Sequence, residues 1–126
     1  MTKQLTLNIW GREFTLPIEY DCHTGETVTQ QQTSAVKRFA SHKDWIADAK
    51  EQVEDFCKAS VTEDDNNNKK DNIFSYVKPH YLFVKRDEKN PRVALMCKYR
   101  YDPEHGLAVV FASDGAATVG IQDIIL

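Results

Sequence analysis

The loop Asp102-Pro-Glu-His-Gly106 carries the densest set of chemically capable side chains in this sequence. Asp102, Glu104 and His105 bring two carboxylates and an imidazole together, which is the material for acid–base catalysis or metal binding. The same segment also builds a turn, because aspartate bonds nearby backbone N–H groups, proline presets φ, and the closing glycine adopts a left-handed conformation. Turn-building is the stronger interpretation, followed by contact of Glu104 and His105 with a partner, and then by catalysis or metal binding.

The adjacent residues Cys22 and His23 are the other candidates for chemistry, because they could join the loop in a small metal-dependent or hydrolytic enzyme. Two adjacent residues do not have the spacing of a metal site, and Cys22, Cys57 and Cys97 form no C-x-x-C pair. Cys57 and Cys97 fall on predicted core faces, where cysteine acts as a small hydrophobic residue. We predict reduced thiols, no catalytic residue, no metal and no cofactor.

Basic residues of neighbouring strands form a second candidate surface. Lys98 and Arg100 lie on the solvated face of their predicted strand, and Lys85 and Arg86 come from the strand before it. A charged, solvated face is the plainer interpretation, and a docking site for an acidic partner is the functional one. The candidate partner-binding residues are therefore Asp102, Glu104, His105, Lys98 and Arg100.

Two apolar strands must position the loop, and together they form a hairpin within 93–111. We predict a five-residue connection from Asp102 to Gly106, because this register places every large apolar side chain on one face. The expected opposite pairs are Tyr101 with Leu107, Tyr99 with Val109, and Cys97 with Phe111.

Alternating apolar residues predict a second hairpin near the N-terminus. Leu5 to Ile9 and Phe14 to Tyr20 read as its strands, and Gly11-Arg12 as its tight turn. Pro17 has no backbone N–H, so its strand should lie at an edge of the sheet or have that position facing solvent.

Helix signals follow this hairpin. Thr29 and Gln32 have the spacing of a capping box that opens a short helix. Ser41 is the next candidate cap, and apolar residues from Trp45 onward recur at helical spacing to about Ala59. Further strands are expected at His80–Arg86 and near Ala117–Ile121, the latter after an Asp-Gly turn.

These elements predict one α+β domain spanning residues 1–126. Its antiparallel sheet has about six strands, with two sequential helices inserted after the second strand and packed on one face. The opposite face should be mixed and partly wet. The segment at about 62–72 is rich in asparagine and charge and should be a mobile loop, since it has too little apolar surface to order itself.

Composition narrows the function classes. The 126 residues are 41% hydrophobic and 28% charged, which excludes a disordered or fibrous chain. The net charge of −3 argues against a nucleic-acid binder. No apolar run approaches the roughly 20 residues of a membrane span, and the N-terminus lacks the apolar core of a signal peptide. We therefore expect a cytoplasmic protein that binds neither nucleic acid nor membrane.

Several landmarks together resemble a family of small bacterial cytoplasmic domains of unknown function, some of them immunity-like proteins near toxin loci. The landmarks are Thr29-Gln-Gln-Gln32, Val77-Lys-Pro79, Tyr101-Asp-Pro-Glu-His-Gly106 and Ile121-Gln-Asp-Ile124. The resemblance covers most of the chain, implies a binding role, and supplies no catalytic residue. The sequence departs from the family pattern in its Asn-rich loop and at Tyr101, where the pattern leads us to expect tryptophan.

The leading hypothesis is a non-enzymatic protein-binding module with a protein partner of unknown identity. It could be immunity-like and neutralise a toxin, or bind another cytoplasmic protein. The first alternative is a small metal-dependent or hydrolytic enzyme that uses Asp102, Glu104 and His105. The second is a structural homo-oligomer subunit that assembles through an exposed sheet edge, so the chain is expected to be a monomer or a homodimer.

Overall fold

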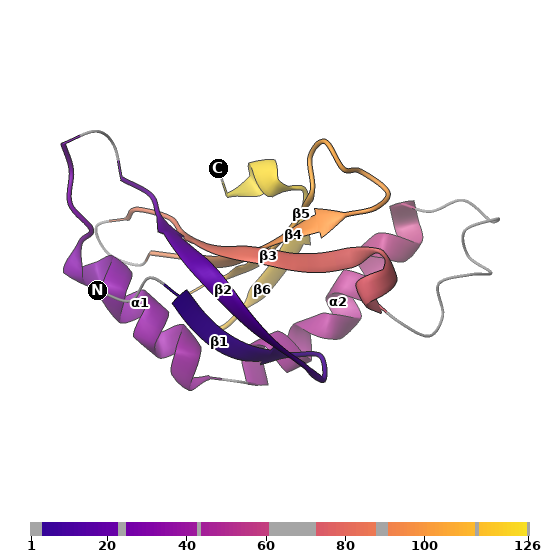
Figure 1. The fold of residues 1–126 in the computed structure, drawn as a ribbon, viewed down its shortest axis with the longest axis horizontal. Coiled ribbons are helices and arrows are strands. Elements are labelled where there is room, and N and C mark those ends of the chain that lie inside the picture. The colour runs from indigo at the N-terminus through magenta and orange to yellow at the C-terminus, as the bar shows by residue number, and fades with distance from the viewer. Residues whose placement is uncertain are drawn as a thin grey trace.

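The computed structural model describes residues 4–22, 25–42, 44–60, 73–87, 91–112 and 114–125, and the predicted loop at 62–72 lies outside them. The described part contains six strands in one sheet, ordered β1-β2-β3-β4-β5-β6, and two α-helices (Figure 1). Along the chain the elements are β1 (Gln4–Ile9), β2 (Arg12–Tyr20), α1 (Gln30–Ser41), α2 (Asp44–Ser60), the 3₁₀ turn η1 (Ile73–Ser75), β3 (Val77–Val84), β4 (Val93–Tyr99), β5 (Leu107–Phe111), β6 (Ala117–Gly120) and the 3₁₀ turn η2 (Gln122–Ile124). The fold is α+β.

The sheet is mixed, so the prediction of a purely antiparallel sheet was wrong. β2 and β3 run parallel, with Ile18 opposite Leu82 and Tyr20 opposite Val84. The other neighbouring strands are antiparallel. The physical reason is the connection: parallel neighbours need a long crossover, and α1 and α2 occupy the chain between β2 and β3.

The main core joins the two helices to the sheet. Figure 1 shows α1 and α2 along one side of the sheet and the C-terminal turn on the other. Buried residues of both helices, among them Phe39 and Val53, belong to one cluster with buried residues of the first five strands. None of the described helices is long and apolar enough to cross a membrane.

The centre of the other sheet face is more deeply buried than predicted. Met96 and Ala108 are fully buried there, because Ile125 from the C-terminal tail packs against them. Lys98 and Arg100 on the same side are exposed. This face therefore has an apolar part under the tail and a charged part beyond it.

The first hairpin has its tight turn at Trp10-Gly11, one position before the predicted Gly11-Arg12. Ile9 faces Arg12, and both central residues have positive φ, 50° at Trp10 and 90° at Gly11. Two-residue hairpin turns with two positive φ angles match the twist of the strands. The Trp10 indole donates a hydrogen bond to the Ile46 carbonyl at 2.9 Å, which ties this turn to α2.

Pro17 lies in an interior strand, with its side chain exposed. Of the two predicted placements, the solvent-facing one is therefore correct and the edge placement is not. The pairing of β2 with β3 begins at Ile18, so the missing N–H of Pro17 lies just outside that ladder.

The capping box at the start of α1 is confirmed. Thr29 Oγ1 accepts from the Gln32 backbone at 3.1 Å, and Gln32 Oε1 accepts from the Thr29 backbone at 2.9 Å. The predicted cap at Ser41 is wrong, because Ser41 belongs to α1 and its hydroxyl donates to the Arg38 carbonyl at 2.9 Å.

The register of the β4–β5 hairpin differs from the prediction. Cys97, four positions before Tyr101, faces Leu107, and Val93 faces Phe111. The shift is even, so the large apolar side chains still share one face and pack into the main core. The predicted five-residue loop is wrong because the pairing of β4 with β5 stops at Cys97 and Leu107, and the chain turns just after, where the Asp102 N–H donates to the Tyr99 carbonyl at 3.3 Å.

Candidate binding site

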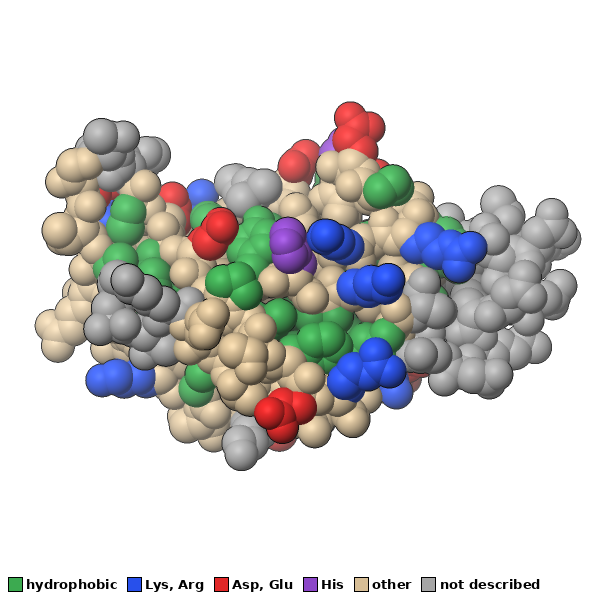
Figure 2. Space-filling view, viewed as in Figure 1, with side chains coloured by type: hydrophobic (Ala, Val, Ile, Leu, Met, Phe, Trp, Pro, Cys, Tyr) green, Lys and Arg blue, Asp and Glu red, His purple; other side chains and the backbone are tan. Residues whose placement is uncertain are grey.

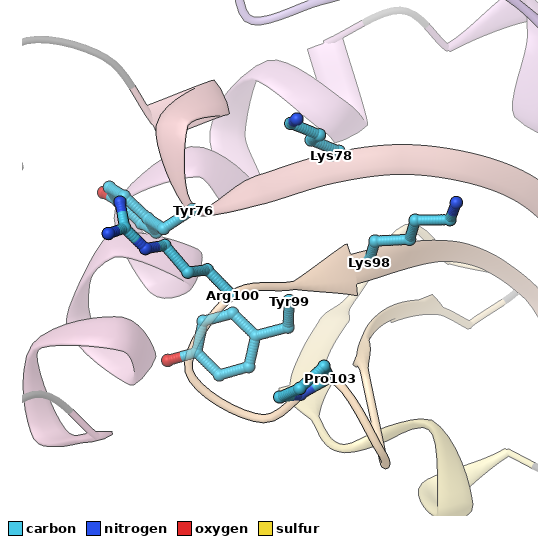
Figure 3. Close-up of a pocket in the computed structure, with 6 residues that line it drawn as sticks. All are labelled: Tyr76, Lys78, Lys98, Tyr99, Arg100 and Pro103. Atoms are coloured by element: carbon cyan, nitrogen blue, oxygen red, sulfur yellow. The ribbon is translucent and has the colours of Figure 1, made fainter.

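A pocket of about 400 Å³ lies where β3 and β4 approach the loop that follows β4 (Figure 3). We call it the basic pocket, because three of its lining residues are cationic. The lining residues are Tyr76, Lys78, Lys98, Tyr99, Arg100 and Pro103. Its volume is within the range of sites that hold small ligands.

Two lysines of the pocket occupy opposite positions on neighbouring strands. Lys78 of β3 and Lys98 of β4 are direct partners in the antiparallel register. Side chains at such positions have Cβ atoms about 5 Å apart, and like charges placed there destabilise a sheet. We therefore expect repulsion between the two ammonium groups to lower the stability of the sheet at this point.

A β-bulge brings Lys78 into this position. The β3–β4 register shifts between Pro79 and Tyr81, so β3 has one additional residue there. In a regular strand, residues five positions apart point to opposite faces of the sheet. The extra residue in β3 reverses this alternation, so Val77 and Leu82 both reach the main core. Bulges of this kind re-aim side chains near binding sites. Sequence reasoning did not identify Lys78 as a candidate site residue. The signal that could have found it is the break in the apolar alternation between Val77 and Leu82.

Arg100 and Tyr76 form one wall of the pocket. The Arg100 backbone N–H donates to the Tyr76 carbonyl at 2.9 Å, and the Arg100 side chain extends towards Tyr76 (Figure 3). Burial, together with the neighbouring Cys57 and Glu54, raises the pKa of Tyr76 to about 12. The Tyr76 phenol is therefore neutral at physiological pH. Sequence reasoning did not single out this residue.

The described residues contain no ion pair that involves Lys78, Lys98 or Arg100. The ion pairs among them are Lys85 with Asp21 at 3.6 Å, Arg86 with Glu26 at 3.4 Å, and His105 with Asp102 at 3.0 Å. Figure 2 shows several Lys and Arg side chains gathered over the end of β3 that follows η1.

Lys85 and Arg86 were expected on the same basic surface as Lys98 and Arg100. The structure separates them, because Lys85 and Arg86 follow the far end of β3 and have carboxylate partners there.

The Asp102–Gly106 loop borders the basic pocket through Pro103. The Asp102 carboxylate accepts from the His105 backbone at 3.3 Å and lies 3.0 Å from His105 Nδ1. The Gly106 N–H donates to the Asp102 carbonyl at 2.8 Å. Asp102 therefore builds the turn, while Glu104 and His105 expose their side chains.

His105 has acidic neighbours on two segments. Its hydrogen bond to Asp102 and the charge of Asp102 raise the pKa of His105, with smaller contributions from Glu104 and Asp123. The backbone N–H of Gln122 donates to the His105 carbonyl at 3.2 Å, which fixes the loop to η2.

The structure does not bring Cys22 to this loop. Cys22 lies beside Arg86, whose Nη1 is 3.6 Å from the sulfur, at the end of β4 opposite to Asp102. At about 3.3 Å per residue, the length of β4 separates the two by roughly 20 Å. His23 lies outside the described residues. Within the described ranges, no three His, Cys, Asp or Glu residues are placed to hold a metal ion.

The core positions predicted for Cys57 and Cys97 are confirmed. The exposed fractions are 1% for Cys57 and 0% for Cys97. Burial, with a smaller contribution from Cys57, raises the pKa of the Cys97 thiol, so it is unreactive in the folded protein.

Comparison with known proteins gives a match to one family model, described as a domain of unknown function, DUF6985, over residues 1–126. No curated protein and no solved structure matches the chain.

Proposed function

The chain belongs to the DUF6985 family, and we propose that it is a non-enzymatic module that binds an acidic segment of a partner protein in the basic pocket. Carboxylates from this segment would lie between Lys78 and Lys98, within reach of Arg100. A toxin that the domain neutralises, or another cytoplasmic protein, would be a partner of this kind.

The observation that carries the proposal is the direct opposition of Lys78 and Lys98 in the sheet. Stability alone does not favour two like charges at opposite positions, and no described acidic side chain forms an ion pair with either lysine. A bound carboxylate would remove the repulsion and gain charge-assisted hydrogen bonds from both ammonium groups.

The remaining pocket residues include one exposed arginine and two buried tyrosines. Arginine is among the residue types that dominate binding energy at protein interfaces, whereas Tyr76 and Tyr99 are only 6% and 2% exposed and support the pocket from the core. The domain as a whole carries a net charge of −3. A local cationic pocket on an anionic domain orients an acidic partner as it approaches.

We assign the exposed loop to the rim of this interface. Glu104 and His105 lie next to Pro103, so a partner seated in the pocket would meet their side chains. Asp102 positions both residues through its bonds within the loop. Glu104 disfavours a second acidic group at the rim and would select the orientation of the bound segment.

The proposal is tested with the tagged full chain and the double variant Lys78→Gln/Lys98→Gln. Partners captured from a lysate of the source organism are identified by mass spectrometry, and the binding of the purified partner is then measured by calorimetry. We expect the double variant to bind at least about tenfold more weakly, because each charge-assisted contact contributes about 1.5–3 kcal/mol. The affinity of the wild-type domain should fall with added salt more steeply than that of the variant.

The matched control is Lys37→Gln/Lys50→Gln, which removes two charges from exposed positions on α1 and α2. It should retain wild-type affinity, because neither residue lines the pocket. Equal affinity of the two double variants would refute a role for the basic pocket. A third double variant, Glu104→Ala/His105→Ala, tests the rim separately and should change partner selection more than pocket affinity.

A further inference from the structure

β1 forms one edge of the sheet, and its outer side has backbone groups ready to pair. Ile9 and Arg12 close the two-residue turn as a hydrogen-bonded pair, and such pairs alternate along an antiparallel ladder. Leu5, Leu7 and Ile9 therefore bond to β2, whereas the backbone groups of Gln4, Thr6 and Asn8 point outward. Among the described residues, nothing pairs with this outer side.

A groove of about 280 Å³ runs beside this edge. Four consecutive β1 residues, Leu5 to Asn8, line it on one side. Apolar residues at the junction of α1 and α2, among them Phe39 and Ile46, line it on the other. The groove thus offers both a row of backbone partners and an apolar floor, the two requirements for adding a strand.

The opposite edge of the sheet, β6, is protected against pairing with another strand, whereas the β1 edge is not. β6 is only four residues long, and Gln52 of α2 donates from its side chain to the Ala117 carbonyl at 3.1 Å. Natural sheets block free edges with lysine, proline, bulges or short strands. From Gln4 to Ile9, β1 has no charged residue, no proline and a regular register with β2.

We propose that β1 pairs with β1 of a second copy of this chain, in antiparallel orientation about a two-fold axis at Thr6. This register places Thr6 opposite its symmetry mate and Gln4 opposite Asn8. In this register the backbone groups of Gln4, Thr6 and Asn8 all have partners in β1 of the second copy. In a register centred on Leu7, only Thr6 and Asn8 would have such partners.

The side chains of β1 fit this self-pairing. The solvent face would bring together only uncharged hydroxyl and amide groups, so no like-charge repulsion opposes it. On the helix side, Leu5 would lie beside Leu7 of the other copy, near the apolar floor of the groove. An isologous contact of this kind closes into a dimer and does not extend into a filament.

Light scattering and sedimentation of the full chain test the pairing. The wild type should have twice the chain mass, and Thr6→Lys should be monomeric, since it places two positive charges directly opposite each other at the axis. Thr15→Lys is the matched control: it breaks the same Thr6–Thr15 hydroxyl contact of 2.9 Å, but it lies one strand inward. This control should remain a dimer.

A charge-pair experiment separates loss of pairing from loss of fold. Thr6→Lys and Thr6→Glu should each be folded monomers by circular dichroism, and an equimolar mixture should restore the dimer mass. A wild type that is monomeric at every concentration overturns the proposal and leaves a strand of another protein as the remaining occupant of the edge. A dimer unaffected by Thr6→Lys also overturns it. The basic pocket is on β3 and β4, so either proposal can fail without the other.

Discussion

The side-chain amide of Gln32 donates a hydrogen bond to the backbone oxygen of Val84, 3.2 Å away and 52 residues later in the chain. The same amide group donates to the Asp21 carbonyl at 3.1 Å, and the side-chain oxygen accepts from Thr29. Gln32 is completely buried. One residue thus connects the start of α1 to the ends of the two parallel strands.

Replacing Gln32 by alanine should lower the free energy of unfolding by about 1–3 kcal/mol, because buried polar groups lose their partners. The comparison is Gln31→Ala, an exposed neighbour in the same helix turn, which should change stability little. Urea denaturation of both variants measures the difference. Equal stabilities would show that the Gln32 contacts contribute no net stability.

The opposed lysines of the basic pocket should cost stability in the unliganded protein. Lys98→Gln is expected to raise the free energy of unfolding by about 0.2–1 kcal/mol at low salt, because it removes the repulsion with Lys78. The gain should shrink at 1 M salt, where screening is strong. Lys37→Gln on α1 serves as the control. Destabilisation by Lys98→Gln at low salt would contradict the electrostatic account of this pair.

Gly106 should tolerate alanine poorly for two reasons. Its φ is +65°, and an added Cβ would lie 2.6 Å from Gln122 Nε2, which donates to the Cys97 carbonyl. Gly25→Ala has a similar backbone cost at φ +87°, but its Cβ would meet no described atom within 4 Å. Gly25→Ala should cost about 1–2 kcal/mol, and Gly106→Ala about 1 kcal/mol more. Thermal denaturation can compare the two variants, and equal costs would show that Gln122 moves aside freely.

The pair of His105 and Asp102 should make loop stability depend on pH. Hydrogen bonding to Asp102 raises the pKa of His105 in the folded state. The stabilisation is therefore fully present below the unfolded-state pKa, about 6.5, and is lost as pH rises through the higher folded-state value. NMR titration of the His105 ring should show a midpoint that falls in Asp102→Asn. An unchanged midpoint would exclude Asp102 as the cause.

The three thiols should differ in accessibility. Cys57 and Cys97 are buried, whereas Cys22 is half-buried. A chromogenic disulfide reagent should therefore modify one thiol quickly in the native protein and all three after unfolding. Cys22→Ser should remove the fast phase. A fast phase that persists in this variant would mean that the core around Cys57 or Cys97 opens readily.

Local signals in the sequence determined much of the secondary structure. The capping box of Thr29 and Gln32 and the long amphipathic α2 were predicted because capping and helical periodicity involve residues within a few positions of each other. Alternation in β4 and β5 also gave the face that packs against the helices, whereas the other face, predicted to be partly wet, is buried at its centre under the C-terminal tail. Lys98 and Arg100 were chosen as exposed residues by the same pattern, and both line the basic pocket.

Long-range contacts decided the strand register, the parallel pairing and the position of the bulge, which local sequence patterns could not predict. Alternation has a period of two, so it assigns a face but cannot distinguish registers that differ by four residues, and Cys97 rather than Tyr101 faces Leu107. The parallel pairing of β2 with β3 depends on how the helices cross the sheet. The meeting of Lys78 with Lys98 depends on a bulge. These features arise between residues distant in sequence, where the free energy of packing, and not local propensity, selects one arrangement.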